Sequence, residues 1–410
     1  MPRPTIDGAR VLADLNALRA VGTYKTGVHK PSLSTEHVAS LAWLEGRMRD
    51  ANLSPTTDGI GNVLGRSSNA GPKLLAGSHL ESQNYAGWLD GPLGVVYALE
   101  AARVINCDAA FGGAAVEVAS WCDEEGHFGH FLGSRSYIGG VSEADIDAAV
   151  DRSSGRMMRE ALAAAGYAGR ARVTVERGRH VGYIEAHIEQ GETLESGGLK
   201  IGVVTSIVGI WQFKIVVEGV QNHAGTTRMS IRRDAGLAAV KLLADLDQIF
   251  PRHIGPRTVW TVGRITLDPG APSIIPGHAE VLFQIRDDDT VTLERLESVL
   301  RATAAEHDRR GPCKISIEKL RASVPAHMDA KFQTAIESAA RDIVPGKSVR
   351  LPSGAGHDAQ TLSTVMPAAM LFVPSIGGIS HHWTENTEDA DIVMGAAVFV
   401  SACARILALK

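Results

Sequence analysis

The sequence has few cysteines and no closely spaced pair of them. The 410 residues contain four, none in a Cys-x-x-Cys arrangement: Cys107, Cys122, Cys313 and Cys403. Thiolate zinc sites and disulfide-stabilised small folds both require paired cysteines. The pattern therefore indicates neither of them, and it fits a protein of a reducing cytoplasm.

Clusters of basic residues and long apolar runs are also missing. The formal net charge is -5, and the basic pairs Arg232-Arg233 and Arg309-Arg310 are isolated. This charge distribution does not indicate a basic surface that would bind nucleic acid or an anionic membrane. No segment has about 18 uninterrupted apolar residues, and the N-terminus has no basic stretch followed by an apolar core. We therefore expect a cytoplasmic protein that acts on a small molecule.

What the chain does contain is an alternation of short apolar strands and helices. The composition, 44% hydrophobic and 21% charged, is that of a soluble globular protein, and the length suggests two domains. The predicted strands cover residues 73–78, 115–121, 181–186 and 370–373. The pattern predicts an α/β domain with a central, mostly parallel sheet flanked by helices, whose ligands bind beyond the carboxyl ends of the strands.

The pattern changes between residues 207 and 323. A strand, a helix, two strands, a helix and a final strand follow one another there, at residues 211–217, 233–250, 259–267, 281–285, 290–306 and 314–318. This βαββαβ order predicts a smaller ferredoxin-like domain. It would interrupt the sheet domain, which would consist of residues 1–206 and 324–410.

Imidazole and carboxylate side chains collect just after the predicted strands of the sheet domain. They are His79, Asp90, Glu124, Glu125, His187 and His381. A single histidine at a strand end is usually structural, but this coincidence across four strands favours a metal site. Three histidines with two or three carboxylates suit zinc and neighbouring divalent ions, and they are enough to hold two of them.

The same residues lie in motifs that resemble a known family. The motifs are GSHLES, GWLDGPLGV, DEEGHFGHFLGSR, HIEQG, NHAGTTRM, IIPGHAEVLFQIRD, GAGHDAQ and GISHHWTE. Together they resemble the metal-dependent N-carbamoyl-L-amino-acid hydrolase and allantoate amidohydrolase family, the hydantoinase/carbamoylase branch of the aminoacylase and carboxypeptidase clan. The resemblance implies a metallopeptidase-like catalytic domain, an inserted dimerisation or lid domain, a homodimer, and hydrolysis of a linear amide or ureido C–N bond.

The resemblance also implies a ligand set for two metal ions per subunit. His79, Asp90 and His187 would hold one ion. Asp90, Glu125 and His381 would hold the second, so that Asp90 bridges the pair. Zn²⁺ or Mn²⁺ would fit these ligands, with Ni²⁺ or Co²⁺ also compatible.

Glu124 would be the general base that activates a water molecule between such ions. Glu81 stands where the family usually has aspartate, and its carboxylate would orient His79. His127 and His130 lie beside the glutamates, where they are alternative ligands or contributors to packing.

Five residues would contact the substrate by the same resemblance: Gln190, His223, Ser273, Arg286 and Gly356. Arg286 offers a planar fork for a carboxylate, or an ordinary surface ion pair. His223 would stabilise the developing oxyanion, in the neighbouring subunit's site, or would simply cap a turn. Gln190 would otherwise bond loop backbone, and Gly356 would otherwise make a tight turn.

Some positions depart from the family pattern and leave the substrate open. Ser273 replaces an expected asparagine, and His382-Trp383 replaces the usual Asn-Pro beside His381, which is chosen over His382 as the ligand. We expect an N-carbamoyl amino acid or an allantoate-like ureido acid as substrate. The alternatives are an aminoacylase or dipeptidase, and a non-catalytic binding protein with the same fold.

Overall fold

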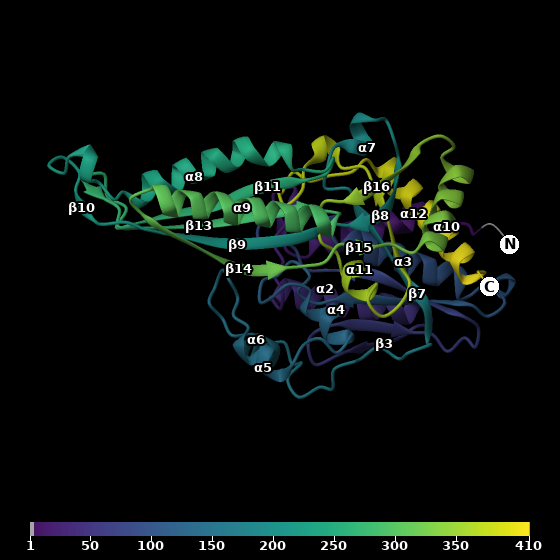
Figure 1. Cartoon of the computed structure of the whole chain (residues 1–410). Helices are drawn as coiled ribbons and strands as arrows, with labels where there is room; N and C mark the ends of the chain where they lie inside the picture. Colours follow the sequence, from purple (N-terminus) through teal and green to yellow (C-terminus); the bar gives the residue numbers. More distant parts are fainter. Residues whose placement is uncertain (1–3, 410) are drawn as a thin grey trace. The chain divides into compact units, whose positions relative to one another are not determined.

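The computed structural model describes residues 4–409 and divides the chain into two compact units. The large domain comprises the residues up to Thr205 and those from His327 onward, and the inserted domain comprises Ser206–Ala326. Each unit has its own buried apolar core. Figure 1 shows the elements of both.

The large domain is built on a nine-stranded mixed sheet in the order β15-β8-β17-β7-β5-β6-β4-β3, with β16 beside β8. Its four central strands are parallel: β17 (Ala368–Val373), β7 (His180–Ile188), β5 (Lys73–His79) and β6 (Ala115–Trp121). The outer strands are β15 (Ala326–His327), β8 (Ile201–Ile207), β4 (Val63–Arg66), β3 (Ser54–Thr57) and β16 (Ser348–Ser353). β8 pairs with β17, and β4 pairs with β6, both in antiparallel orientation. The sheet, which we expected to be mostly parallel, is therefore parallel at its centre and antiparallel toward its edges.

Helices cover this sheet, and every residue of β6 and β17 is therefore buried. The long helices are α1 (Gly8–Ala20), α2 (Thr35–Asp50), α3 (Pro92–Ile105), α10 (Ala330–Ile343) and α12 (Asp389–Leu407). α3 packs on β5 and β6, and α12 packs on α3 and α10. Among residues 4–409, α12 is the one helix with the length and composition of a membrane span, and 67% of its most apolar window is buried in the protein.

Shorter elements connect these layers. They are β1 (Thr23–Tyr24), β2 (Gly27–Val28), α4 (Leu132–Tyr137), α5 (Glu143–Ala148), α6 (Met158–Ala164), α7 (Thr193–Ser196) and α11 (Asp358–Leu362). The sequence pattern does not predict the two-residue strands, because they have too few side chains for a period to be seen.

The inserted domain has the βαββαβ order that the sequence predicts. Its antiparallel sheet runs β11 (Val259–Asp268), β13 (His278–Asp287), β9 (Gly209–Glu218) and β14 (Lys314–Ala322). Helices α8 (Ala235–Ile249) and α9 (Thr290–Arg310) lie along one face of it (Figure 1). A separate antiparallel pair of short strands, β10 (Asn222–His223) and β12 (Ile274–Ile275), completes the domain.

The close approach of α3 to the sheet depends on Gly94. A Cβ atom there would lie 2.3 Å from the carbonyl oxygen of Ala186 and 2.8 Å from Cβ of Ser78. Gly94→Ala should therefore lower the free energy of unfolding by about 1–3 kcal/mol through overpacking. The control is Gly46→Ala in α2, where a Cβ meets nothing within 4 Å; it should add about 0.5–1 kcal/mol. Urea unfolding followed by circular dichroism measures both, and equal stability of the two variants would contradict this packing.

Candidate metal centre

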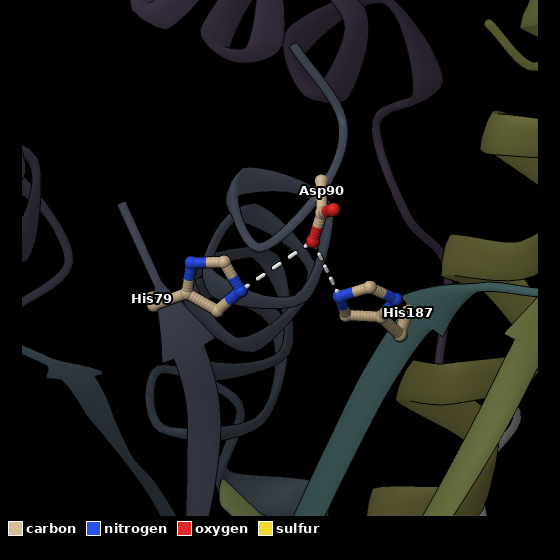
Figure 2. Close-up of side chains that lie close together, drawn as sticks. All are labelled: His79, Asp90 and His187. Carbon is tan, nitrogen blue, oxygen red and sulfur yellow. Dashed lines mark ion pairs between the residues drawn. The ribbon is translucent and has the colours of Figure 1, made fainter. Parts of the chain in front are cut away.

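The predicted ligands converge at the carboxyl ends of the parallel strands. His79 is the last residue of β5, and His187 is the penultimate residue of β7. Asp90 precedes α3, whose first residue is Pro92, a favourable N-terminal position for proline. Figure 2 shows the Asp90 carboxylate between the two imidazole rings.

One oxygen of Asp90 faces both of these histidines. Oδ1 lies 3.0 Å from Nε2 of His187 and 3.5 Å from Nε2 of His79 (Figure 2). The other ring nitrogens are held by main chain, since Nδ1 of His79 lies 3.1 Å from the carbonyl oxygen of Glu81 and Nδ1 of His187 lies 2.9 Å from that of Ile188. A carbonyl oxygen only accepts, so each Nδ1 carries a proton, and in the neutral form of each ring the lone pair of Nε2 faces Asp90.

This arrangement fits a divalent cation. Nε2 of His79 is buried and has no hydrogen-bond partner among residues 4–409. Two lone pairs and a carboxylate oxygen directed at one point require positive charge there, and ligating histidines commonly donate their other N–H to a carbonyl. The ligand atoms of His79, Asp90 and His187 all lie within 4.8 Å of one another.

A second ligand group shares Asp90. Its other oxygen, Oδ2, lies 3.4 Å from Nε2 of His381, which lies 3.7 Å from Oε2 of Glu125. The ligand atoms of Asp90, Glu125 and His381 also lie within 4.8 Å of one another. His382 instead directs Nδ1 to the hydroxyl of Thr384 at 2.7 Å, so the structure brings His381 to the site and not its neighbour.

The acidic turn after β6 aims Glu124 and Glu125 into the site. The strand ends at Trp121, and the backbone turns at Asp123 (φ 64°) and again at Gly126 (φ 72°). The Asp123 carboxylate accepts the N–H groups of residues 127, 128 and 129 and so fixes the turn. Glu124 consequently places Oε2 3.6 Å from Nε2 of His79. This role of Asp123 could not be predicted from the sequence, because its partners are main-chain groups that a motif does not reveal.

Two further residues that sequence reasoning missed hold the ligands. Gln83 donates its main-chain N–H to Oε1 of Glu125 (3.0 Å) and its side-chain amide to Oε2 (2.7 Å). Glu385 accepts the N–H of Asp90 at 3.1 Å and the Ser380 hydroxyl at 2.9 Å, which ties the loop of Asp90 to the loop of His381. Glu385 lies in the GISHHWTE motif, which was the available signal.

Glu81 makes different contacts from those expected. Its side-chain Oε1 lies 3.9 Å from Nδ1 of His79, beyond hydrogen-bond distance, and its main-chain carbonyl orients that ring instead. The carboxylate accepts the main-chain N–H of Glu124 at 2.6 Å. The methylene that distinguishes glutamate from aspartate carries the carboxylate past the histidine.

The concentration of buried carboxylates shifts the pKa values in this pocket. Burial and the neighbouring carboxylates raise the pKa of Glu124 well above its usual range. Burial opposes the charge on Asp90, but its three histidine contacts outweigh that effect and hold the pKa well below its usual range. The contact with Asp90 raises the pKa of His381 to about 9. The pocket therefore favours positive charge, which protons or metal ions supply.

Two of the candidate substrate residues lie in the large domain. Gln190, with a left-handed backbone (φ 57°), donates its amide to Oδ2 of Asp90 at 2.9 Å, so it belongs to the site. Gly356 lies against an aromatic ring, since a Cβ there would be 2.8 Å from Cζ of Phe131. Trp383 is one of the departures from the family pattern. The Nζ atom of Lys25 lies over its ring, 4.1 Å from the ring centroid.

The other three candidates lie in the inserted domain. His223 is exposed on β10, and its Nδ1 accepts the N–H groups of Gly225 (3.0 Å) and Thr226 (3.1 Å), so Nε2 carries the proton of the neutral ring. Ser273 is exposed immediately before β12, the strand that pairs with β10. Arg286, on β13, is half-buried, and burial lowers its pKa.

Comparison with known proteins agrees with this chemistry. The family model described as Peptidase family M20/M25/M40 matches residues 75–405. An N-carbamoyl-L-amino-acid amidohydrolase of Pseudomonas sp. (strain NS671) is 32% identical over 97% of this chain and 98% of its own length. An allantoate amidohydrolase of Bacillus subtilis (strain 168) is 31% identical over 90% of each chain.

A solved structure extends the comparison to three dimensions. The crystal structure of an amidase of the hydantoinase/carbamoylase family from Burkholderia phymatum is 45% identical, covers 99% of both chains and superposes with a TM-score of 0.91. The ligand groups around Asp90 thus stand in a scaffold shared along the whole chain. The chain belongs to peptidase family M20/M25/M40 and to the hydantoinase/carbamoylase family of amidases.

Proposed function

We propose that this protein is an amidohydrolase that uses two divalent metal ions to cleave a linear ureido or amide C–N bond. The observation that carries the proposal is the pair of ligand groups that share Asp90, with Glu124 beside them. His79, Asp90 and His187 would hold one ion, and Asp90, Glu125 and His381 the other. Zn²⁺ and Mn²⁺ suit this mixed set of nitrogen and oxygen donors, as do Ni²⁺ and Co²⁺.

Glu124 would act as the general base. When bound, two such ions supply an acidified water molecule and a polarised substrate carbonyl. Glu124 faces this region and is not needed as a ligand, so its carboxylate would take a proton from the attacking water and return it to the leaving nitrogen. The amide of Gln190, already bonded to Asp90, is placed to orient the substrate.

The substrate would be a small ureido or carbamoyl acid. Relatives named N-carbamoyl-L-amino-acid amidohydrolase, allantoate amidohydrolase and ureidoglycolate hydrolase act on such compounds by name. Arg286, half-buried and planar, would bind the substrate carboxylate with two parallel hydrogen bonds, and Ser273 and Gly356 would complete the pocket.

The free state of all four cysteines supports the cytoplasmic location proposed from the sequence.

A homodimer would complete the site. β11 is an edge strand, and six apolar side chains on β11 and α8 are 40% to 55% exposed: Leu237, Val240, Val259, Val262, Ile265 and Leu267. An unpaired edge with exposed apolar side chains is suited to pairing with a second copy about a twofold axis. Exposed His223, with a proton on Nε2, would then donate to the developing oxyanion in the partner's site.

A substrate panel tests the reaction. Protein reconstituted with Mn²⁺ or Zn²⁺ should release ammonia or amino acid from an N-carbamoyl amino acid or allantoate faster than it cleaves N-acyl amino acids or dipeptides. Glu124→Gln should lower kcat by about 100- to 10,000-fold while elemental analysis still finds two metal equivalents. The exposed control Glu160→Gln should match the wild type. Preference for acyl compounds would indicate an aminoacylase, and no turnover with an unaffected E124Q variant would indicate a binding protein.

Subunit mixing tests the dimer and the role of His223. His223→Ala and Glu124→Gln should each be nearly inactive alone. After equal amounts exchange subunits, about one quarter of wild-type activity should return, because half of the dimers are mixed and each mixed dimer has one intact site. His253→Ala, in the same domain, serves as a control with wild-type activity. If mixing restores nothing, His223 does not act across subunits.

The affinity for metal should depend on pH through His381. A proton on this ring competes with the ion, and its pKa is raised to about 9. A ring with this pKa carries its proton below about pH 9, so affinity should rise with pH up to about 9 and level off above it. Chelator competition at several pH values measures this, and His381→Asn should flatten the slope for one of the two ions. A slope unchanged by this substitution would assign the competing proton to another group.

A further inference from the structure

His37 is a buried histidine that the mechanism above does not use. It lies in the first turn of α2, where the hydroxyl of Ser34 accepts its main-chain N–H, and its side chain is fully buried. Nδ1 of its ring accepts the main-chain N–H of Leu33 at 3.0 Å. An acceptor nitrogen carries no proton, so the proton of this imidazole is on Nε2.

Nε2 of His37 faces the carboxylate of Glu81. The distance from Nε2 to Oε2 is 3.4 Å, and both side chains are fully buried. Neither of these two atoms has a hydrogen-bond partner among residues 4–409. A buried donor and a buried acceptor each cost about 1–3 kcal/mol when left unpaired, so each is the partner that the other requires. Burial also lowers the pKa of His37 to about 4, which agrees with a neutral ring.

The other oxygen of Glu81 holds the general base. Oε1 accepts the main-chain N–H of Glu124 at 2.6 Å, at the turn that directs the Glu124 side chain toward His79. His37 therefore faces one oxygen of this carboxylate while the main chain of Glu124 binds the other. An aspartate at position 81 would be one methylene shorter and would not reach both groups.

We infer that His37 is a positioning residue for Glu124: its Nε2–H group fixes the rotamer of Glu81, and Glu81 fixes the main chain of the base. The inference rests on the proposed function, since it assigns Glu124 as the base. His37 touches neither the substrate nor the reacting atoms. Removing the Nε2 donor should misplace Glu124 without removing a metal ligand.

Two amide substitutions separate this role from simple packing. In His37→Asn the side-chain oxygen occupies the place of Nδ1, so it keeps the Leu33 bond and loses the donor to Glu81. In His37→Gln the amide nitrogen reaches the place of Nε2, so it keeps the donor and loses the Leu33 bond. We expect H37N to lower kcat by about 10- to 100-fold, the usual loss for residues that support a metal site, with KM and metal content near wild type. We expect H37Q to retain most of kcat.

The reverse order would overturn the inference. If H37Q is impaired as much as H37N or more, the Leu33 bond or the ring volume matters and the donor to Glu81 does not. If both variants keep the wild-type kcat, His37 has no effect on the base.

Glu81→Asp provides a second measurement, first as a single variant that leaves His37 intact and then combined with His37→Asn. It should lower kcat, and adding His37→Asn to it should cost little more, because the two changes break the same link. Fully additive losses would overturn the inference.

Crystal structures of H37N and H37Q keep the inference distinct from the proposed function. The separation between Glu124 N and Glu81 Oε1 should increase in H37N and stay near 2.6 Å in H37Q. If the wild-type protein cleaves no ureido or acyl compound, the proposed function fails, and these two structures still decide whether His37 positions Glu124. An unchanged separation in H37N would overturn the inference.

Discussion

The carboxylate of Asp90 is the contact on which the rest of the site depends, because each of its oxygens faces a different ligand group. Oδ1 is shared by His79 and His187, and Oδ2 faces His381. Its loop is held by Glu385 and leads through Gly91 into α3. A Cβ at Gly91 would lie 2.5 Å from the His79 ring, so glycine is required where the helix begins against this candidate ligand.

Burying this many carboxylates would destabilise the fold if they were not compensated. The structure supplies main-chain N–H groups to several of them, to Asp123 from the following loop and to Glu385 from the Asp90 loop. To direct these N–H groups at the carboxylates, the loops adopt backbone conformations that are rare for residues other than glycine. Tyr85, Asp123, Gln190 and His381 all have left-handed conformations, and all lie in loops around the ligands. Strained backbone of this kind persists where surrounding contacts fix it.

The two domains divide the proposed roles by the kind of surface that each can offer. The large domain has a parallel sheet buried on both faces, so its strand ends are rigid supports for metal ligands. The inserted domain covers one face of its sheet and keeps an exposed edge strand, an exposed histidine and a half-buried arginine. Rigid placement suits a ligand, and an accessible surface suits contacts with a substrate or a second subunit.

The order of the main strands and helices, the change of pattern at the inserted domain and the candidate ligands could all be predicted from the sequence. Apolar periodicity and the residues after each strand are local properties, so they are visible without a fold. Which main-chain N–H groups each buried carboxylate binds became visible only in the folded structure. Asp123, Glu385 and Glu81 bind main-chain N–H groups, and these contacts depend on turns that residue identity does not encode. The pairing of His37 with Glu81 joins residues 44 positions apart, and the packing of α2 against the sheet domain is what brings them together.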